Sequence, residues 1–162
     1  MSGIMAAIVG NQQNIVYASG LYGPSGVDLA PINGSDANNL TPQSKSWIGY
    51  FRPITGGSNS FDISATWTSD DPFEGQYSRA YVWVGPLALA GYTTGNALAS
   101  ANNSSGSGST TLVAGQYYPI RVLWEYYFPF SDNFFTPYNT SGSFALTPPS
   151  GTLWYNTKSN GF

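Results

Sequence analysis

Two adjacent carboxylates, Asp70 and Asp71, are the residues of this chain whose type and spacing best suit chemistry. Carboxylate oxygens are preferred ligands of Ca²⁺. In a regular strand, neighbouring side chains point to opposite faces, so the two carboxylates can share one cation only where the backbone is distorted. Asp and Pro are also turn formers, and Pro72 follows the pair, so the same residues could form an ordinary solvated turn. The pair therefore supports two hypotheses, an ion site and a turn.

The rest of the composition excludes most catalytic chemistry. The chain has no cysteine and no histidine, which excludes disulfides, thiol nucleophiles, Ser–His triads and zinc sites with the usual ligands. Glu125 and Asp132 could be imagined as a glycosidase pair, but the chain has only eight acidic residues and nothing else supports that chemistry. We therefore predict a protein that is not an enzyme and requires no cofactor, with calcium as the one ion that its residues suggest.

Charge also limits the partners. The net charge is −3, and the five cationic residues are scattered without a run or stripe, so a nucleic-acid partner is not expected. The apolar run near Met1 lacks a basic flank and is too short for a signal peptide or a membrane span. The sequence thus predicts neither secretion through a signal peptide nor membrane insertion.

Hydrophobic periodicity predicts strands. Residues 61–67 alternate strictly between apolar and polar side chains, and Tyr118, Ile120, Val122 and Trp124 recur at every second position, which is the pattern of half-buried strands. Charged residues make up only 8% of the chain and aromatic residues 16%, which does not fit a helical protein with charged exposed faces. We predict an all-β fold, an antiparallel two-sheet β-sandwich. The expected shared core consists of Phe61, Ile63, Trp67, Trp83, Tyr118, Ile120, Val122 and Trp124.

The chain is expected to form a single domain. Residues 1–46 are predicted to form an N-terminal arm with edge strands, and residues 47–162 to form the sandwich. Within the sandwich we expect further strands at 47–51, 143–146 and 153–155, with a polar tail after the last one. A helical turn is expected at 87–90, and a flexible loop at 99–110, which is rich in Asn, Ser and Gly.

One segment is too aromatic for a solvated loop. Between positions 126 and 135 the sequence reads Tyr-Tyr-Phe-Pro-Phe-Ser-Asp-Asn-Phe-Phe, and each large ring represents ~150 to 250 Å² of surface to be buried. Either the segment folds back on the sandwich, or it forms a contact surface with another protein. If the segment forms a contact surface, the predicted contact residues are Tyr126, Tyr127, Phe128, Phe130, Phe134 and Phe135.

The order of several motifs resembles the GLEYA domain, a branch of the lectin-like β-sandwiches that also include the anthrax protective antigen domain and yeast flocculins. The resemblance covers roughly residues 47–151. Similar sequences also occur in structural proteins of bacteriophages and large viruses. The motifs are Phe61–Trp67, Asp70-Asp71, Ala80–Gly85, Gly91-Tyr92-Thr93-Thr94 with Asn96-Ala97, and Ala114–Val122.

The resemblance implies a Greek-key-like sandwich, no catalysis, and a calcium-dependent sugar site. In the fungal adhesins, two adjacent aspartates hold the ion together with an asparagine from a later loop. The resemblance implies that Asp70 and Asp71 are the aspartate pair here, and that Asn133 or Asp132 takes the place of the asparagine. Two departures weaken the match. Pro72 stands where the family usually has glycine, and the aromatic segment replaces the later loop.

Two functions from different classes follow. The first is a virion structural protein, a capsid-decorating or appendage subunit at the virion surface whose partners are other virion proteins or copies of itself. The absent signal peptide and the aromatic segment favour this function. The alternative is an extracellular, calcium-dependent module that binds a cell-surface glycan, which the aspartate pair favours.

Overall fold

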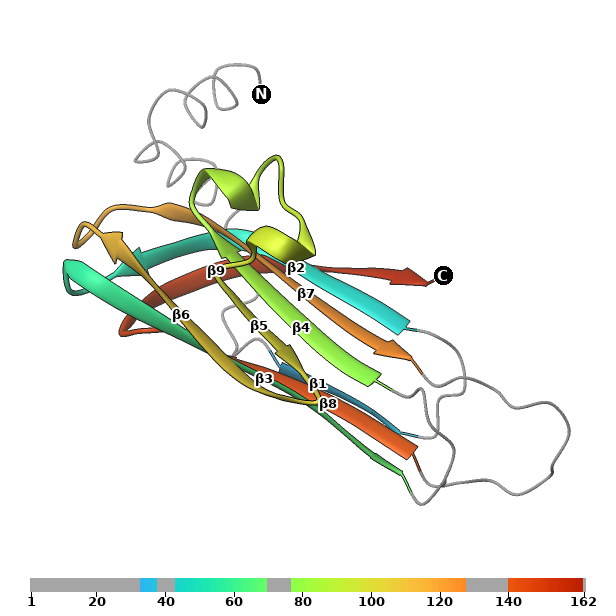
Figure 1. Cartoon of the computed structure of the whole chain (residues 1–162). Helices are drawn as coiled ribbons and strands as arrows, with labels where there is room; N and C mark the ends of the chain where they lie inside the picture. Colours follow the sequence, from blue (N-terminus) through green and yellow to red (C-terminus); the bar gives the residue numbers. More distant parts are fainter. Residues whose placement is uncertain (1–32, 38–42, 70–76, 128–139, 162) are drawn as a thin grey trace, which may run out of the picture.

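The computed structural model describes residues 33–37, 43–69, 77–127 and 140–161. These residues form nine β-strands and two short 3₁₀ helices. The strands make two antiparallel sheets that pack face to face (Figure 1). The prediction of an all-β, antiparallel sandwich is therefore confirmed. No helix within the described ranges is long and apolar enough to span a membrane.

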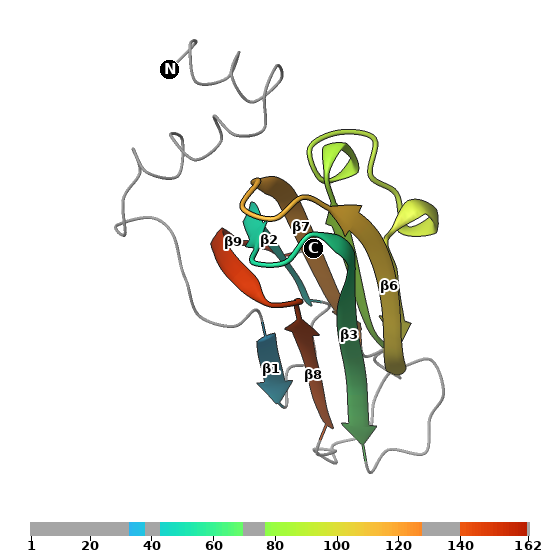
Figure 2. The same cartoon turned by 90° about the vertical axis from the view of Figure 1, so that its left-hand side faces the viewer.

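The smaller sheet has four strands, seen side by side in Figure 2. Its strand order is β1-β8-β3-β6, so strands from the start, middle and end of the chain are neighbours. The bounds are Asn33–Ala37 for β1, Thr140–Thr147 for β8, Gly57–Ser69 for β3 and Ser104–Leu112 for β6.

The larger sheet has five strands in the order β5-β4-β7-β2-β9. The strands are β5 (Ala99–Asn102), β4 (Tyr77–Val84), β7 (Tyr118–Tyr127), β2 (Gln43–Pro53) and β9 (Gly151–Gly161). Both β1 and the start of β2 precede position 47, so the sheets include residues on both sides of that position. The polar tail expected after Tyr155 is wrong, because β9 pairs with β2 as far as Gly161.

Aromatic side chains fill the space between the sheets. Phe61, Ile63 and Ala65 on β3 are buried as their alternation predicts, and Ile120, Val122 and Trp124 on β7 face them. Trp67 and Tyr118 are partly buried at the rim of this core. The rings meet across the sheets in three pairs: Phe51–Phe61 at 5.2 Å, Trp124–Phe144 at 5.0 Å and Trp47–Phe144 at 4.7 Å between centroids.

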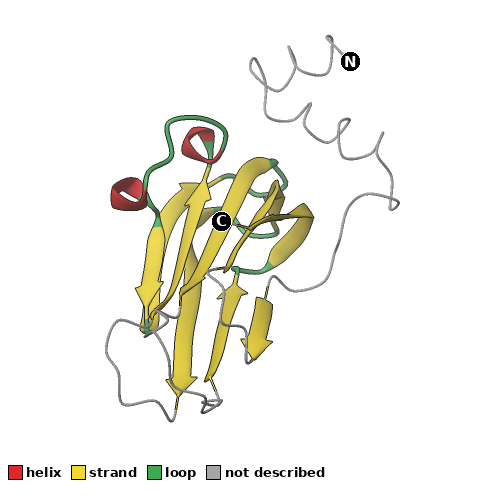
Figure 3. Ribbon diagram, turned by 90° about the vertical axis from the view of Figure 1, so that its right-hand side faces the viewer, coloured by secondary structure: helices red, strands yellow, loops and turns green. Residues whose placement is uncertain are grey.

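Trp83 is buried, with 1% of its surface exposed, but it does not belong to this core. Its neighbour Val82 points inward, so Trp83 lies on the outer face of the five-stranded sheet. There it is covered by the chain after β4, which contains η2 (Pro86–Ala88) and η3 (Thr94–Asn96) (Figure 3). The prediction that Trp83 shares the intersheet core is therefore wrong.

Hydrogen bonds hold this cover in place. The Trp83 indole N–H donates to the backbone oxygen of Thr93 and to Oδ1 of Asn96, both at 3.0 Å. The Asn96 amide group donates to the Gly91 carbonyl at 2.9 Å. Arg121 lies 3.9 Å from the ring centre of Tyr92 and donates to the Ala88 carbonyl. The helical turn expected at 87–90 is present here as η2, and the Gly-Tyr-Thr-Thr-Gly-Asn motif is structural.

The flexible loop expected at 99–110 is also wrong, because these residues form β5 and most of β6. The two strands belong to different sheets and are joined at Asn103, whose φ of 49° lies in the left-handed region. A Cβ atom at Gly106 or Gly108 would overlap the carbonyl oxygens of Ser100 and Leu98. Glycine at these positions therefore lets the edges of the two sheets close on each other.

We predict that Trp83→Ala lowers the free energy of unfolding by about 3 to 5 kcal/mol, because it empties a large buried site. Trp83→Phe should cost less, about 1 to 3 kcal/mol, since it mainly leaves the Thr93 and Asn96 oxygens without their donor. Urea unfolding measures both values. A loss below 1 kcal/mol for Trp83→Ala would contradict the buried position of the ring.

Candidate functional site

Two connections that carry the predicted site residues leave the sandwich at the same end. Residues 70–76 join Ser69 to Tyr77, and residues 128–139 join Tyr127 to Thr140. Ser69 is paired with Thr140 in the four-stranded sheet. Tyr77 is paired with Tyr127 in the five-stranded sheet. The four strand ends thus anchor both connections at one end of the molecule, which we call the loop end (Figure 1).

Ser78 ties the two sheets together beside the loop end. Its side chain is fully buried, and its hydroxyl accepts a hydrogen bond from the Trp124 indole N–H at 2.9 Å. The same hydroxyl donates to the Ser143 carbonyl of the opposite sheet at 3.3 Å. The Ser78 backbone N–H donates to Oδ1 of Asn103 at 2.7 Å. One small polar residue therefore fixes β4, where residues 70–76 end, relative to β8, where residues 128–139 end.

Large rings lie in the core beneath the loop end. Trp124 and Tyr126 stack with centroids 6.2 Å apart. Tyr126 is 2% exposed, and a Cβ at Gly142 on the facing sheet would overlap its ring. The amino group of Lys45 lies 5.6 Å from the Trp124 ring centre, which allows a cation–π interaction. Tyr126, predicted as a contact residue, is therefore a core residue instead.

Most other predicted site residues lie outside the described residues. These are Asp70, Asp71, Asp132 and Asn133 of the predicted ion and sugar site, and Phe128, Phe130, Phe134 and Phe135 of the predicted contact surface. Tyr127 is the last residue of β7. In the described ranges, no three Asp, Glu, His or Cys residues come together as a metal site. The predicted roles of these residues stay predictions.

Glu125 lies on the outer face of the five-stranded sheet, directly opposite Arg79 on β4. The Arg79 guanidinium packs on the ring of Tyr77 at 4.0 Å and donates to Asn102. Burial, and then the charge of Glu125, raises the pKa of the Tyr81 phenol above its usual value. The phenol is therefore neutral at physiological pH. Glu125 has a structural setting here, and its proposed glycosidase partner Asp132 lies outside the described residues.

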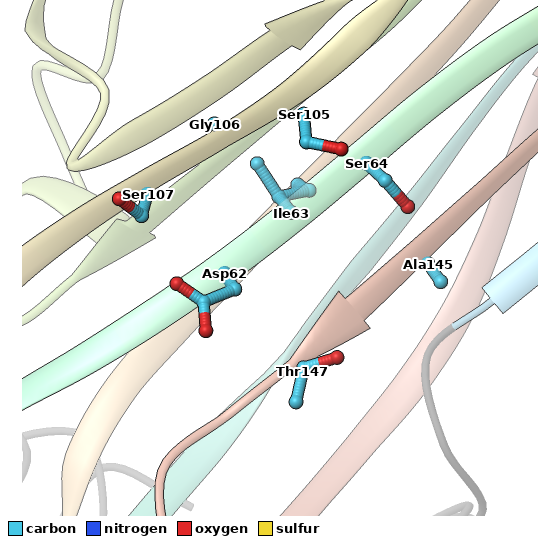
Figure 4. Close-up of a pocket in the computed structure, with 8 residues that line it drawn as sticks. All are labelled: Asp62, Ile63, Ser64, Ser105, Gly106, Ser107, Ala145 and Thr147. Atoms are coloured by element: carbon cyan, nitrogen blue, oxygen red, sulfur yellow. The ribbon is translucent and has the colours of Figure 1, made fainter.

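A groove of about 410 Å³ crosses the outer face of the four-stranded sheet. Asp62 on β3 lies between Ser107 of β6 and Thr147 of β8, with Ser64 and Ser105 in the next row (Figure 4). Sequence analysis did not single out this groove, although the alternation of β3 predicts that its Ser and Thr residues lie on the solvent-exposed face. Its lining offers hydroxyl groups and one carboxylate but no aromatic surface. The groove can form hydrogen bonds, but its apolar lining, Ile63 and Ala145, includes no ring on which a sugar could pack.

We predict that Ser78→Ala lowers the free energy of unfolding by about 1 to 3 kcal/mol, because the Trp124 indole N–H loses its buried acceptor. Ser105→Ala is the matched control. Ser105 is exposed on the outer face, so the change should stay within about 0.5 kcal/mol. Equal effects of the two variants in urea unfolding would show that the Ser78 hydroxyl does not connect the sheets.

A comparison with solved structures found the crystal structure of the Epithelial Adhesin 6 A domain from Candida glabrata, which was solved in complex with Galb1-3GlcNAc. The similarity has a TM-score of 0.47 at 19% sequence identity. It covers 81% of this chain and 66% of that chain, so this chain spans about two thirds of the adhesin domain. A comparison with curated proteins gave no match.

The comparison with protein families gave one result that covers most of the strands described above. The GLEYA domain matches residues 45–127, which run from β2 to the end of β7 and include both the aspartate pair and the cover over Trp83. The matched part is slightly more than half of the 162 residues. The chain therefore belongs to the GLEYA domain family.

Proposed function

We propose that this protein is a carbohydrate-binding adhesion module without enzymatic activity, which acts outside the cell or at a cell surface. Membership of the GLEYA domain family supports this function, because the family is lectin-like. The absence of cysteine and histidine from the sequence agrees with a binding role. The proposed partner is a glycan.

The observation that carries the proposal is the pairing of strand ends. Ser69 pairs with Thr140, and Tyr77 pairs with Tyr127. Segments that are far apart in the sequence, one with Asp70 and Asp71 and one with Asp132 and Asn133, are thereby anchored side by side. A site built from both segments needs this arrangement.

The donor set suits calcium. Carboxylate and amide oxygens are ligands that Ca²⁺ prefers, and the ion takes about 6 to 8 oxygens in a flexible geometry. Asp70 and Asp71 would hold the ion together with Asn133 or Asp132, and the remaining positions would be open to backbone carbonyls, water or sugar hydroxyls. When bound, calcium supplies a positive charge that orients hydroxyl groups of the glycan.

No finding supports the virion role that was the first function expected from the sequence. The family match favours the alternative, glycan binding, over a capsid-decorating or appendage subunit. The predicted aromatic contact residues that follow Tyr126 do not distinguish the two roles. Glycan recognition is therefore the function that we place first.

We predict that calcium raises the melting temperature. A ligand at 100 times its Kd adds about 2.7 kcal/mol to the stability of the state that binds it. For a protein of this size, that corresponds to a shift of about 5 to 10 °C. The shift should be absent with a chelator, and Asp71→Asn should abolish it together with glycan binding on an array.

Asp62→Asn is the matched control, because it removes the same charge from an exposed position in the groove on the outer face of the four-stranded sheet. This variant should keep both the calcium response and glycan binding. The proposal fails if calcium leaves the melting temperature of the unmodified protein unchanged and no glycan binds. A loss of the response in Asp62→Asn, but not in Asp71→Asn, would move the site to the groove.

A further inference from the structure

The two sheets have four edge strands, and three of them are protected. β5 and β6 close on each other through the contacts of Gly106 and Gly108. β1 is only five residues long and contains Asp36. Short strands, charges and covered edges are the devices that prevent edge-to-edge association.

β9 has only one of these devices, a single charge at Lys158. It is 11 residues long and pairs with β2 along its whole length. In the part of the chain that the structure describes, no strand pairs with its second edge. Its sequence, Gly-Thr-Leu-Trp-Tyr-Asn-Thr-Lys-Ser-Asn-Gly, contains no proline and no acidic residue, and Lys158 is its one charge. A long edge of this kind is a template for another strand.

We propose that β9 pairs with β9 of a second copy of this chain, so that the two five-stranded sheets join into one across a two-fold axis. Identical edges can pair with each other in an antiparallel, self-complementary way. Full overlap of residues 151–161 places the axis at Asn156, the middle of the strand. This register forms about one hydrogen bond per residue between the copies.

The residue types fit this register. It places Trp154 opposite Lys158 of the second copy, so the single charge of each strand meets an uncharged residue. Thr152 faces Asn160, and the two Asn156 residues face each other. No like charges are opposed, because Lys158 is the one charged residue of the strand. A chain with only 8% charged residues also has little charge elsewhere to oppose association.

The pairing also fixes where the two glycan sites of a dimer would lie, an inference that rests on the proposed function. Gly161 is opposite Gln43 at the loop end, and Gly151 is opposite Pro53 at the other end. Antiparallel pairing of the two copies therefore points their loop ends in opposite directions. A dimer would present one glycan-binding end on each side and could bridge two surfaces.

A charge-swap experiment on the full chain tests the dimer without any glycan. Sedimentation should give a dimer for the unmodified protein and a monomer for Asn156→Lys, because two lysines would meet at the axis. Asn156→Asp alone should also be monomeric, because two aspartates would meet there. An equal mixture of the two variants should sediment as a dimer, which also shows that both variants fold.

Ser107→Lys is the matched control, since it adds the same charge on the outer face of the other sheet, and it should remain a dimer. A monomeric unmodified protein at the highest soluble concentration would overturn the proposal. Slow exchange of those β9 amides that point away from β2 would show, in such a monomer, that another segment of the same chain covers the edge. A dimer that persists in both Asn156 variants would place the interface elsewhere. None of these outcomes depends on whether a glycan binds.

Discussion

Burial of large aromatic rings between two sheets is the interaction on which this structure depends. The chain has no disulfide to constrain it and few charges to pair. Phe51, Phe61, Trp124 and Phe144 are all buried and meet in contacts that cross from one sheet to the other. Because each such ring removes a large apolar surface from water, these contacts set how the sheets face each other.

Polar contacts then refine the arrangement at both ends of β4. Near its start, the buried Ser78 hydroxyl joins Trp124 to the backbone of the opposite sheet. Beyond its end, Asn96 and Thr93 cap the indole of Trp83. The first contact lies beside the loop end, so it stabilises the strand ends from which the two site-bearing segments leave. The second covers the outer face of the sheet at the opposite end.

The sequence predicted those strands in which one face is apolar and the other is polar, such as β3. The sequence did not predict the position of side chains in strands that are apolar on both faces, because periodicity does not show which face meets the core. Around Trp83, apolar residues occupy both faces of β4, since one face meets the core and the other meets the 85–98 segment. Alternation alone could not assign Trp83 to the second of these faces.

At β5 and β6, the composition of the chain favoured a loop although these residues form strands. Ser and Gly are common in loops, and their alternation over residues 105–109 was a usable signal of period two that composition obscured. The need for glycine at Gly106 and Gly108 comes from a contact with the other sheet, which no local pattern reveals. Tyr126 was similarly assigned by the aromatic run that follows it, although its place on the inner face of β7 continues the alternation of Val122 and Trp124.

At the candidate site, too, residue types predicted which residues take part but not how the fold brings them together. Residue chemistry indicated the aspartate pair, and the resemblance supplied Asp132 and Asn133 as the expected later ligands. Neither could show that the two segments are anchored at one end, because that follows from the pairing of strand ends between distant parts of the chain. Long-range register of this kind comes from the packing of the whole sandwich.

The central claim is that a glycan binds at the loop end, and an NMR titration with calcium and a glycan found by array screening tests it most directly. The account predicts that the backbone amide signals of Ser69, Tyr77 and Thr140 shift as glycan is added, while those of Asp62 and Ser107 in the groove do not. Shifts confined to Asp62 and Ser107, with the strand ends unchanged, would contradict the account.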